Sequence, residues 1–143
     1  MLCYPATLEQ DAETGTYIVG FADIPFAHAV GVDPAEALSS GGDALATAFG
    51  IFVERGEPIP APTPPRVGQP VVMLPVVMAG KVALYSAMRE AGLYPDDLAR
   101  RLNIAPSIVQ RLLSFRHHSR IEQIETALAM LDRRLVVEVV KAA

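Results

Sequence analysis

The sequence predicts an α+β chain with two domains, the first of order βββαβ and the second made of helices. Residues 57–65 hold five prolines, and because proline fixes φ and lacks an amide donor, this stretch forms neither helix nor central strand. Before the prolines, apolar residues alternate with polar ones up to residue 32 and then recur at helical spacing up to Gly56, and helical spacing returns from Lys81 onward. We place the domains at residues 1–78 and 79–143, with a proline-rich segment, 57–70, inside the first.

The N-terminal domain begins with strand-like segments. Leu2–Glu9, Thr16–Ala22 and Ala27–Val32 alternate and contain β-branched or aromatic residues. A turn at Asp11–Gly15 separates the first two, and a corner at Asp23-Ile24-Pro25 separates the last two. These signals predict an antiparallel meander of three strands.

A helix is expected to follow the meander. Asp33 can accept from the first free amides, Pro34 suits the first helical position, and Gly56 is a typical residue just past a helix end. Glycine inside a helix costs about 1 kcal/mol relative to alanine. Gly41 and Gly42 therefore predict a close contact on that helix.

Apolar patterns predict the remaining elements. A fourth strand is expected at Val71–Val77. Four helices are then expected, at Lys81–Ala91, Pro95–Leu102, Pro106–Leu113 and Ile121–Leu131. The β-branched segment Leu135–Val140 predicts a closing strand without an evident partner in the helical domain.

Residues 95–114 match a helix-turn-helix. Two helices that cross closely need a small residue at their contact, which Ala99 supplies, and a turn residue that tolerates left-handed backbone, which Asn103 supplies. Apolar residues occupy the expected inward positions, namely Leu98, Leu102, Ile104, Val109 and Leu112. An ordinary helical hairpin is the alternative, since it shares the apolar spacing.

The outward face of the second helix of this pair is the candidate base-reading surface. Glutamine suits adenine and arginine suits guanine. A run of basic and polar residues follows and suits phosphate. The predicted DNA-binding residues are Ser107, Gln110, Arg111, Ser114, Arg116, His117, His118, Ser119 and Arg120.

Charge divides the chain in the same way. Residues 1–65 carry nine acids and one base, and residues 66–143 carry seven acids and eleven bases, which give net charges of −8 and +4. Halves of opposite sign predict a basic partner for the first and nucleic acid for the second. The alternative is that both are simply solvated surfaces.

We do not expect a secreted protein, a membrane protein or a metalloprotein. The start MLCYPATLEQ lacks the features of a signal peptide, and the apolar run 71–80 is too short for a membrane span, so we expect a cytoplasmic protein. Cys3 is the single cysteine, and His28, His117 and His118 stand in no metal-ligand spacing. We therefore expect neither an internal disulfide, a metal site nor a cofactor.

Motifs in the first half resemble those of a known family. They are Gly15-Thr16-Tyr17, Phe21-Ala22-Asp23-Ile24-Pro25, Asp33-Pro34-Ala35-Glu36-Ala37-Leu38 and Gly56-Glu57-Pro58-Ile59-Pro60-Ala61-Pro62. Together they resemble the HicB antitoxins over about residues 1–75. The second half resembles the Cro/repressor-type helix-turn-helix that one HicB branch carries.

The resemblance implies a partial ribonuclease-H-like fold for the first domain. It further implies that this domain binds and blocks HicA, a small basic toxin that cleaves mRNA, while the second domain represses the operon. Toxin contacts would come from Asp23, Ile24, Pro25 and Phe26. The chain has Pro25-Phe26-Ala27 where the family commonly has Pro-Gly-Cys, which alters the contact geometry, and Asp23 and Pro25 could instead serve only the turn.

Two other functions compete with the antitoxin. A nuclease would need acids that converge at strand ends, and we expect no enzyme because most of the acids of the first half fall in turns. These acids are Glu9, Asp11, Glu13, Asp23 and Asp33. A stand-alone repressor with a ligand-sensing first domain is the main alternative. In either regulatory case we expect a homodimer or tetramer on paired DNA half-sites, with Leu135–Val140 pairing across a two-fold axis.

Overall fold

A computed structural model describes residues 2–142. The chain divides into two compact units, residues 1–75 and 76–143. The division falls after Pro75, three residues before the predicted boundary, because Val76–Met78 belong to the first helix of the second unit.

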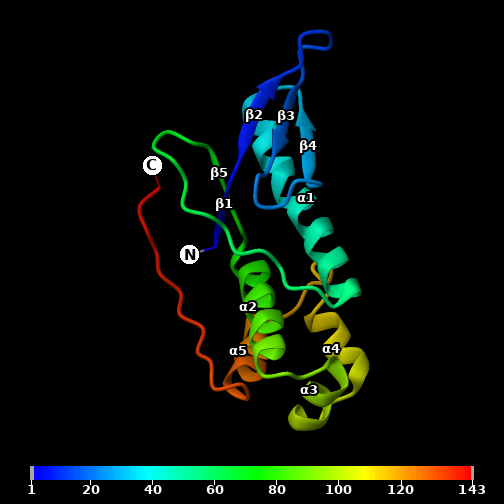
Figure 1. Cartoon of the computed structure of the whole chain (residues 1–143). Coiled ribbons are helices and arrows are strands. Elements are labelled where there is room, and N and C mark those ends of the chain that lie inside the picture. Colours follow the sequence, from blue (N-terminus) through cyan, green and yellow to red (C-terminus); the bar gives the residue numbers. More distant parts are fainter. Residues whose placement is uncertain (1, 143) are drawn as a thin grey trace. The chain divides into compact units, whose positions relative to one another are not determined.

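Unit 1 contains the predicted meander. The strands β2 (Thr7–Gln10), β3 (Tyr17–Gly20) and β4 (His28–Gly31) form an antiparallel sheet in that order (Figure 1). The pairing places Val19 opposite Ala29, and both are buried beneath the helix α1 (Pro34–Arg55). The mixed α+β class is confirmed.

The ends of α1 follow the sequence signals. The Asp33 carboxylate accepts from the Glu36 amide at 2.8 Å, and Gly56 adopts a left-handed φ of 64°. A Cβ on Gly41 would lie 3.1 Å from Val72 and 3.2 Å from Phe21, so the predicted close contact is confirmed there. A Cβ on Gly42 would meet nothing within 4 Å, so no contact explains that glycine.

The first predicted strand is in fact two strands in two sheets. The strand β1 (Cys3–Pro5) pairs antiparallel with β5 (Val71–Met73), and only β2 joins the meander. Between them, the Ala6 amide donates to the Pro70 carbonyl at 2.8 Å. Pro5 still pairs with Val71, and the pairing with β3 begins at Thr7, so the chain changes partner around Ala6.

The fourth predicted strand was too long. It ends at Met73, and Val76 and Val77 open the helix α2 (Val76–Glu90) instead. Pro75 cannot donate to a sheet ladder and directly precedes the helix. A continuous apolar run did not distinguish strand from helix here.

Unit 2 is helical. Its other helices are α3 (Pro95–Leu102), α4 (Pro106–Leu112) and α5 (Ile121–Ala129). The helix α2 packs on α5, where a Cβ on Gly80 would lie 3.1 Å from Ile124, and α3 packs on α4. None of the helices within residues 2–142 has the length and apolar content needed to cross a bilayer.

The C-terminal segment differs from the prediction. Residues 133–142 carry no helix or strand, and Val136, Val137, Val139 and Val140 are exposed. The predicted strand Leu135–Val140 does not form within one chain, because a strand needs a ladder partner and no described segment pairs with it. Its pairing with a second copy stays a prediction.

Candidate nucleic-acid interface and partner-binding corner

The turn between α3 and α4 consists of three residues, 103–105. Asn103 adopts φ 53° and ψ 47°, and its amide and that of Ile104 donate to the carbonyls of Arg100 and Ala99. Ala105 is extended, and Pro106 occupies the first position of α4, as predicted. Asparagine tolerates left-handed backbone better than most residues, so Asn103 allows α3 to end and α4 to begin almost at once.

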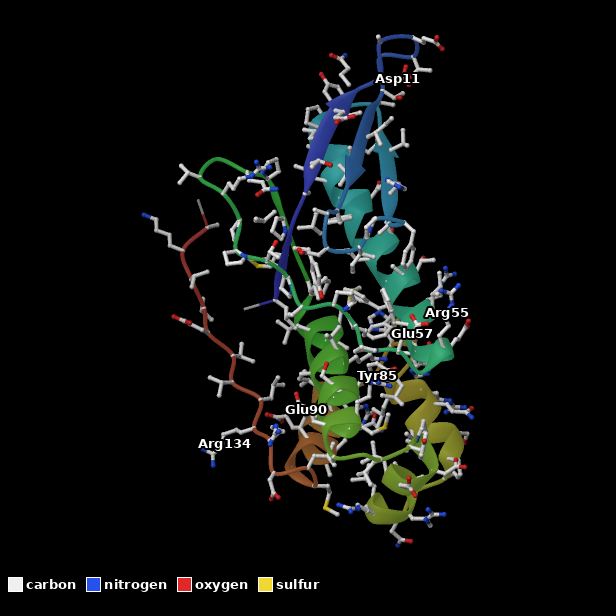
Figure 2. The ribbon with its side chains drawn as sticks, viewed as in Figure 1. Asp11, Arg55, Glu57, Tyr85, Glu90 and Arg134 are labelled. Carbon is white, nitrogen blue, oxygen red and sulfur yellow. The ribbon has the colours of Figure 1, made fainter. Side chains whose placement is uncertain are left out.

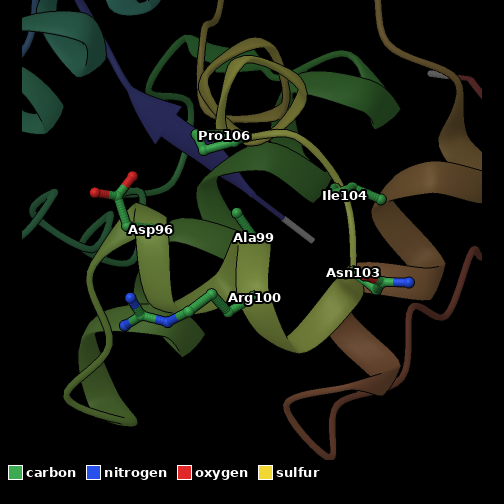
Figure 3. Close-up of a pocket in the computed structure, with 6 residues that line it drawn as sticks. All are labelled: Asp96, Ala99, Arg100, Asn103, Ile104 and Pro106. Atoms are coloured by element: carbon green, nitrogen blue, oxygen red, sulfur yellow. The ribbon is translucent and has the colours of Figure 1, made fainter.

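The contact between the two helices is small and apolar. Ala99 is 2% exposed, and Leu98, Val109 and Leu112 are buried with it, whereas Leu102 and Ile104 are half-buried. A surface hollow marks the junction of α3, the turn and α4 (Figure 3). It is lined by Asp96, Ala99, Arg100, Asn103, Ile104 and Pro106. The arrangement is a helix, a tight turn and a second short helix on a shared core.

The proposed base-reading residues lie together. Ser107, Gln110 and Arg111 are all exposed on α4. Positions three and four apart share one face of a helix. The structure thus brings these three side chains onto one accessible face.

The loop after α4 carries most of the predicted phosphate contacts. Arg116, His117, His118 and Arg120 are exposed, while Ser114 is half-buried. Ser119 differs, since it is 8% exposed and its hydroxyl donates to the Arg111 carbonyl at 3.4 Å. The Ser119 hydroxyl therefore binds the end of α4, and its contact with phosphate stays a prediction.

Lys81 contacts the backbone of this loop, and no sequence pattern predicted a role for it. It is 1% exposed, and its ammonium donates to the carbonyls of Arg111, Ser114 and His117 at 3.0, 2.6 and 2.7 Å. Burial lowers the pKa of Lys81 to about 8. The available signal was a single cation inside the apolar run of α2, next to buried Val82 and Leu84.

The corner of unit 1 has a mixed role. The Asp23 carboxylate accepts from the Thr63 amide at 3.0 Å and from its hydroxyl at 3.2 Å. Ile24 is fully buried, whereas Pro25 and Phe26 are exposed. Of the four predicted toxin contacts, Pro25 and Phe26 present side chains to solvent, and Ile24 is a core residue.

The strand β1 also binds the proline-rich segment. The Tyr4 hydroxyl donates to the Pro60 carbonyl at 2.7 Å, and its ring packs against Phe49. Burial and, to a lesser extent, the negative charge of Asp23 raise the pKa of Tyr4 to about 12. The proline-rich segment is thereby fixed to unit 1 at Pro60 and Thr63.

The acidic side chains of unit 1 are dispersed. Asp11 lies at the tip of the β2–β3 hairpin (Figure 2), where it accepts from the amides of Glu13 and Thr14 at 2.8 and 2.9 Å. These amide hydrogen bonds lower the pKa of Asp11. Asp33 caps α1 and Asp23 binds Thr63. Across residues 2–142, no three histidine, cysteine or acidic side chains gather as metal ligands.

Comparison with known proteins decides the family. Residues 3–83 match the family described as HicB_like antitoxin of bacterial toxin-antitoxin system. The chain belongs to the HicB-like antitoxin family. That match contains the corner, α1, the proline-rich segment and the first half of α2 as far as Ala83, which includes Lys81.

Relatives extend the HicB likeness through unit 2. "Antitoxin HicB" of Pseudomonas fluorescens (strain Pf0-1) is 38% identical over 92% of this chain and 91% of its own length. "Antitoxin HicB" of Escherichia coli (strain K12) is 35% identical over 92% of this chain and 95% of its own length. "Antitoxin HicB 2" of Photorhabdus laumondii is 39% identical over 92% of both chains. The similarity therefore extends beyond residue 83 into the rest of unit 2.

Proposed function

We propose that this HicB family member is the antitoxin of a toxin–antitoxin pair, and that it also represses its own operon. In this proposal unit 1 binds a HicA-type mRNA-cleaving toxin and unit 2 binds operator DNA. The observation that supports the antitoxin role most strongly is the family membership, together with relatives named as antitoxins that match over almost the whole chain. Both targets would be met in the cytoplasm, and the chain itself would perform no catalysis.

The toxin surface is proposed around Pro25 and Phe26. Phe26 is 49% exposed, and its ring lies 5.5 Å from that of Phe52, so an apolar pair is open to a partner. Residues 1–65 have a net charge of −8, which complements a basic toxin and speeds its association. Asp23 would act there mainly by holding the corner to Thr63.

The DNA surface is proposed on α4 and the loop that follows it. Ser107, Gln110 and Arg111 would face base edges in the major groove. Arg116, His117, His118 and Arg120 would lie along the phosphates. Ser114, half-buried at the start of the loop, would be a peripheral contact.

An operator of paired half-sites would need a dimer. The segment 135–140 holds four exposed valines and one acid, Glu138, and it belongs to neither of the described sheets. We propose that this segment pairs with its copy about a two-fold axis, as a dimer or within a tetramer.

Coexpression tests the antitoxin role. A small basic reading frame beside this gene is expressed alone, with the full chain, or with a Phe26→Asp chain. We expect growth arrest alone, rescue by the full chain, and reduced rescue and copurification with Phe26→Asp. A matched Val32→Asp chain, changed at another exposed apolar site of unit 1, should rescue fully. If the full chain neither rescues growth nor copurifies with the product of that reading frame, only the stand-alone repressor remains as a function.

A further inference from the structure

Lys81 is a cation in the core of unit 2. It is 1% exposed and stands on α2 beside Val82 and Leu84, which are also buried. A buried ammonium group is strongly unfavourable unless it is hydrogen-bonded. Its partners therefore indicate what the residue does in the fold.

Those partners are the backbone at the end of α4. The last carbonyls of a helix have no donor within it and need donors from elsewhere. Many helices end on a left-handed glycine or asparagine that supplies such donors, but α4 ends on Leu113 at φ −93° and ψ −2°. The Arg111 carbonyl accepts from the Ser114 amide at 3.2 Å, and the Lys81 ammonium donates to the same carbonyl at 3.0 Å, where its charge suits the negative end of the helix dipole.

The same ammonium also fixes the loop after α4. It donates to Ser114 at 2.6 Å and to His117 at 2.7 Å, so its three acceptors are spaced by three residues. The backbone adds bonds from the Ser114 amide to Arg111 and from the His117 amide to Ser114. The backbone from 111 to 117 is thus held on the Lys81 ammonium, while Arg111, Arg116 and His117 keep their side chains exposed.

We propose that Lys81 is the positioning residue of the DNA interface. By binding three carbonyls it presets the end of α4 and residues 113–118, so that Arg111 and Arg116 meet base and phosphate together. This inference rests on the proposed binding of DNA by α4. A preset loop raises affinity because it loses little conformational entropy on binding. Lys81 itself, being buried, contacts no DNA.

The test compares full-length variants on two DNA probes. One is a duplex taken from directly upstream of the chain's own reading frame, and the other is its shuffled sequence. Lys81→Met keeps the length of the side chain and removes its donors. Ile124→Val, a buried change on the neighbouring helix α5, controls for a general loss of stability.

We expect Lys81→Met to bind the upstream duplex about tenfold more weakly or worse, a change of about 1.4 kcal/mol. Ile124→Val, matched for melting temperature, should bind like the parent. Equal affinity of Lys81→Met and the parent would overturn the inference. Failure of the parent to prefer the upstream duplex would instead overturn the proposed operator binding, whatever the variant does.

A measurement on the unchanged protein covers the case in which Lys81→Met does not fold. The chain has two lysines, Lys81 and the exposed Lys141. In ¹⁵N nuclear magnetic resonance, the Lys81 ammonium protons should exchange with water far more slowly than those of Lys141. Equal exchange rates would show that the ammonium does not hold the loop and would overturn the inference.

Discussion

Asp23 and Thr63 lie forty residues apart in sequence, and the Asp23 carboxylate accepts from both the amide and the hydroxyl of Thr63, at 3.0 and 3.2 Å. This relationship joins the corner that carries Pro25 and Phe26 to the proline-rich segment. Asp23, which the sequence suggested as a toxin contact, thus holds two segments of unit 1 together.

Asp23→Ala should loosen the proline-rich segment and lower the free energy of unfolding by about 1 kcal/mol, since it removes the acceptor of two partly solvated hydrogen bonds. Asp23→Asn keeps one side-chain acceptor oxygen and should be milder. Hydrogen exchange at the Thr63 amide, followed with denaturant unfolding, measures both effects. Unchanged protection of that amide in Asp23→Ala would contradict the assignment.

Gly41 and Gly42 form a matched pair for testing the packing of α1. Gly41→Ala places a Cβ 3.1 Å from Val72 and 3.2 Å from Phe21, so it should destabilise unit 1 by about 1–3 kcal/mol. Gly42→Ala meets nothing within 4 Å and should stabilise by up to about 1 kcal/mol. Thermal unfolding of both variants decides the matter, and equal shifts would argue against the close contact at Gly41.

Lys81 gives stability a distinct pH dependence. Its pKa is about 8 in the folded chain and 10.5 when solvated, so the unfolded state binds more protons between those values. The free energy of unfolding should therefore rise with pH through this window, by up to about 1.4 kcal/mol per unit.

The matching measurement is denaturant unfolding of the parent and Lys81→Met from pH 7 to 10. Above pH 10 the raised pKa of Tyr4, about 12 against 10.0, acts in the opposite direction, because the unfolded chain loses that proton first. The rise should be present in the parent and absent in Lys81→Met. Parallel pH profiles would show that burial does not depress this pKa.

Arg111 and Arg116 should affect DNA binding differently. Arg111→Ala should lose about 1–3 kcal/mol of discrimination at one base position, because arginine there would read a base edge. Arg116→Ala should weaken specific and random duplexes alike and reduce the salt slope by about one. Footprinting and salt titrations separate the two, and an unchanged footprint with Arg111→Ala would refute α4 as the base-reading helix.

Removal of residues 134–143 should shift the chain to a monomer, since the proposed two-fold pairing uses the exposed valines of that segment. Sedimentation equilibrium of the truncated and full chains provides the measurement. A less drastic variant, Val137→Lys, places a charge in the same segment and should weaken the assembly. A truncated chain with the oligomeric state of the full one would contradict the pairing.

Sequence signals predicted helix ends and turns correctly where the conformation depends on only a few neighbouring residues. Asp33 and Pro34 fixed the start of α1, Gly56 its end, and Asn103 the turn between α3 and α4. Each acts through its own φ or through hydrogen bonds to neighbouring amides. The helix bounds of α1 and α3 could therefore be obtained without any long-range contact.

Signals that depend on a partner segment were less informative. Leu2–Glu9 alternates as one strand, yet Ala6 bonds to Pro70 and the strand divides between two sheets. Val76 and Val77 suit strand or helix equally, and Leu135–Val140 finds no ladder within the described chain. The choice in each case depends on which segment supplies hydrogen bonds.

The sequence by itself determined the order of elements up to these changes, the charge of each half and the exposed face of α4, because propensity, periodicity and charge are properties of short segments. Only the tertiary structure decided that Ile24 and Ser119 are buried, that Asp23 binds Thr63, and that Lys81 holds the end of α4. Burial and side-chain pairing join residues about thirty to forty positions apart. No local pattern encodes which distant carbonyl a buried ammonium will reach.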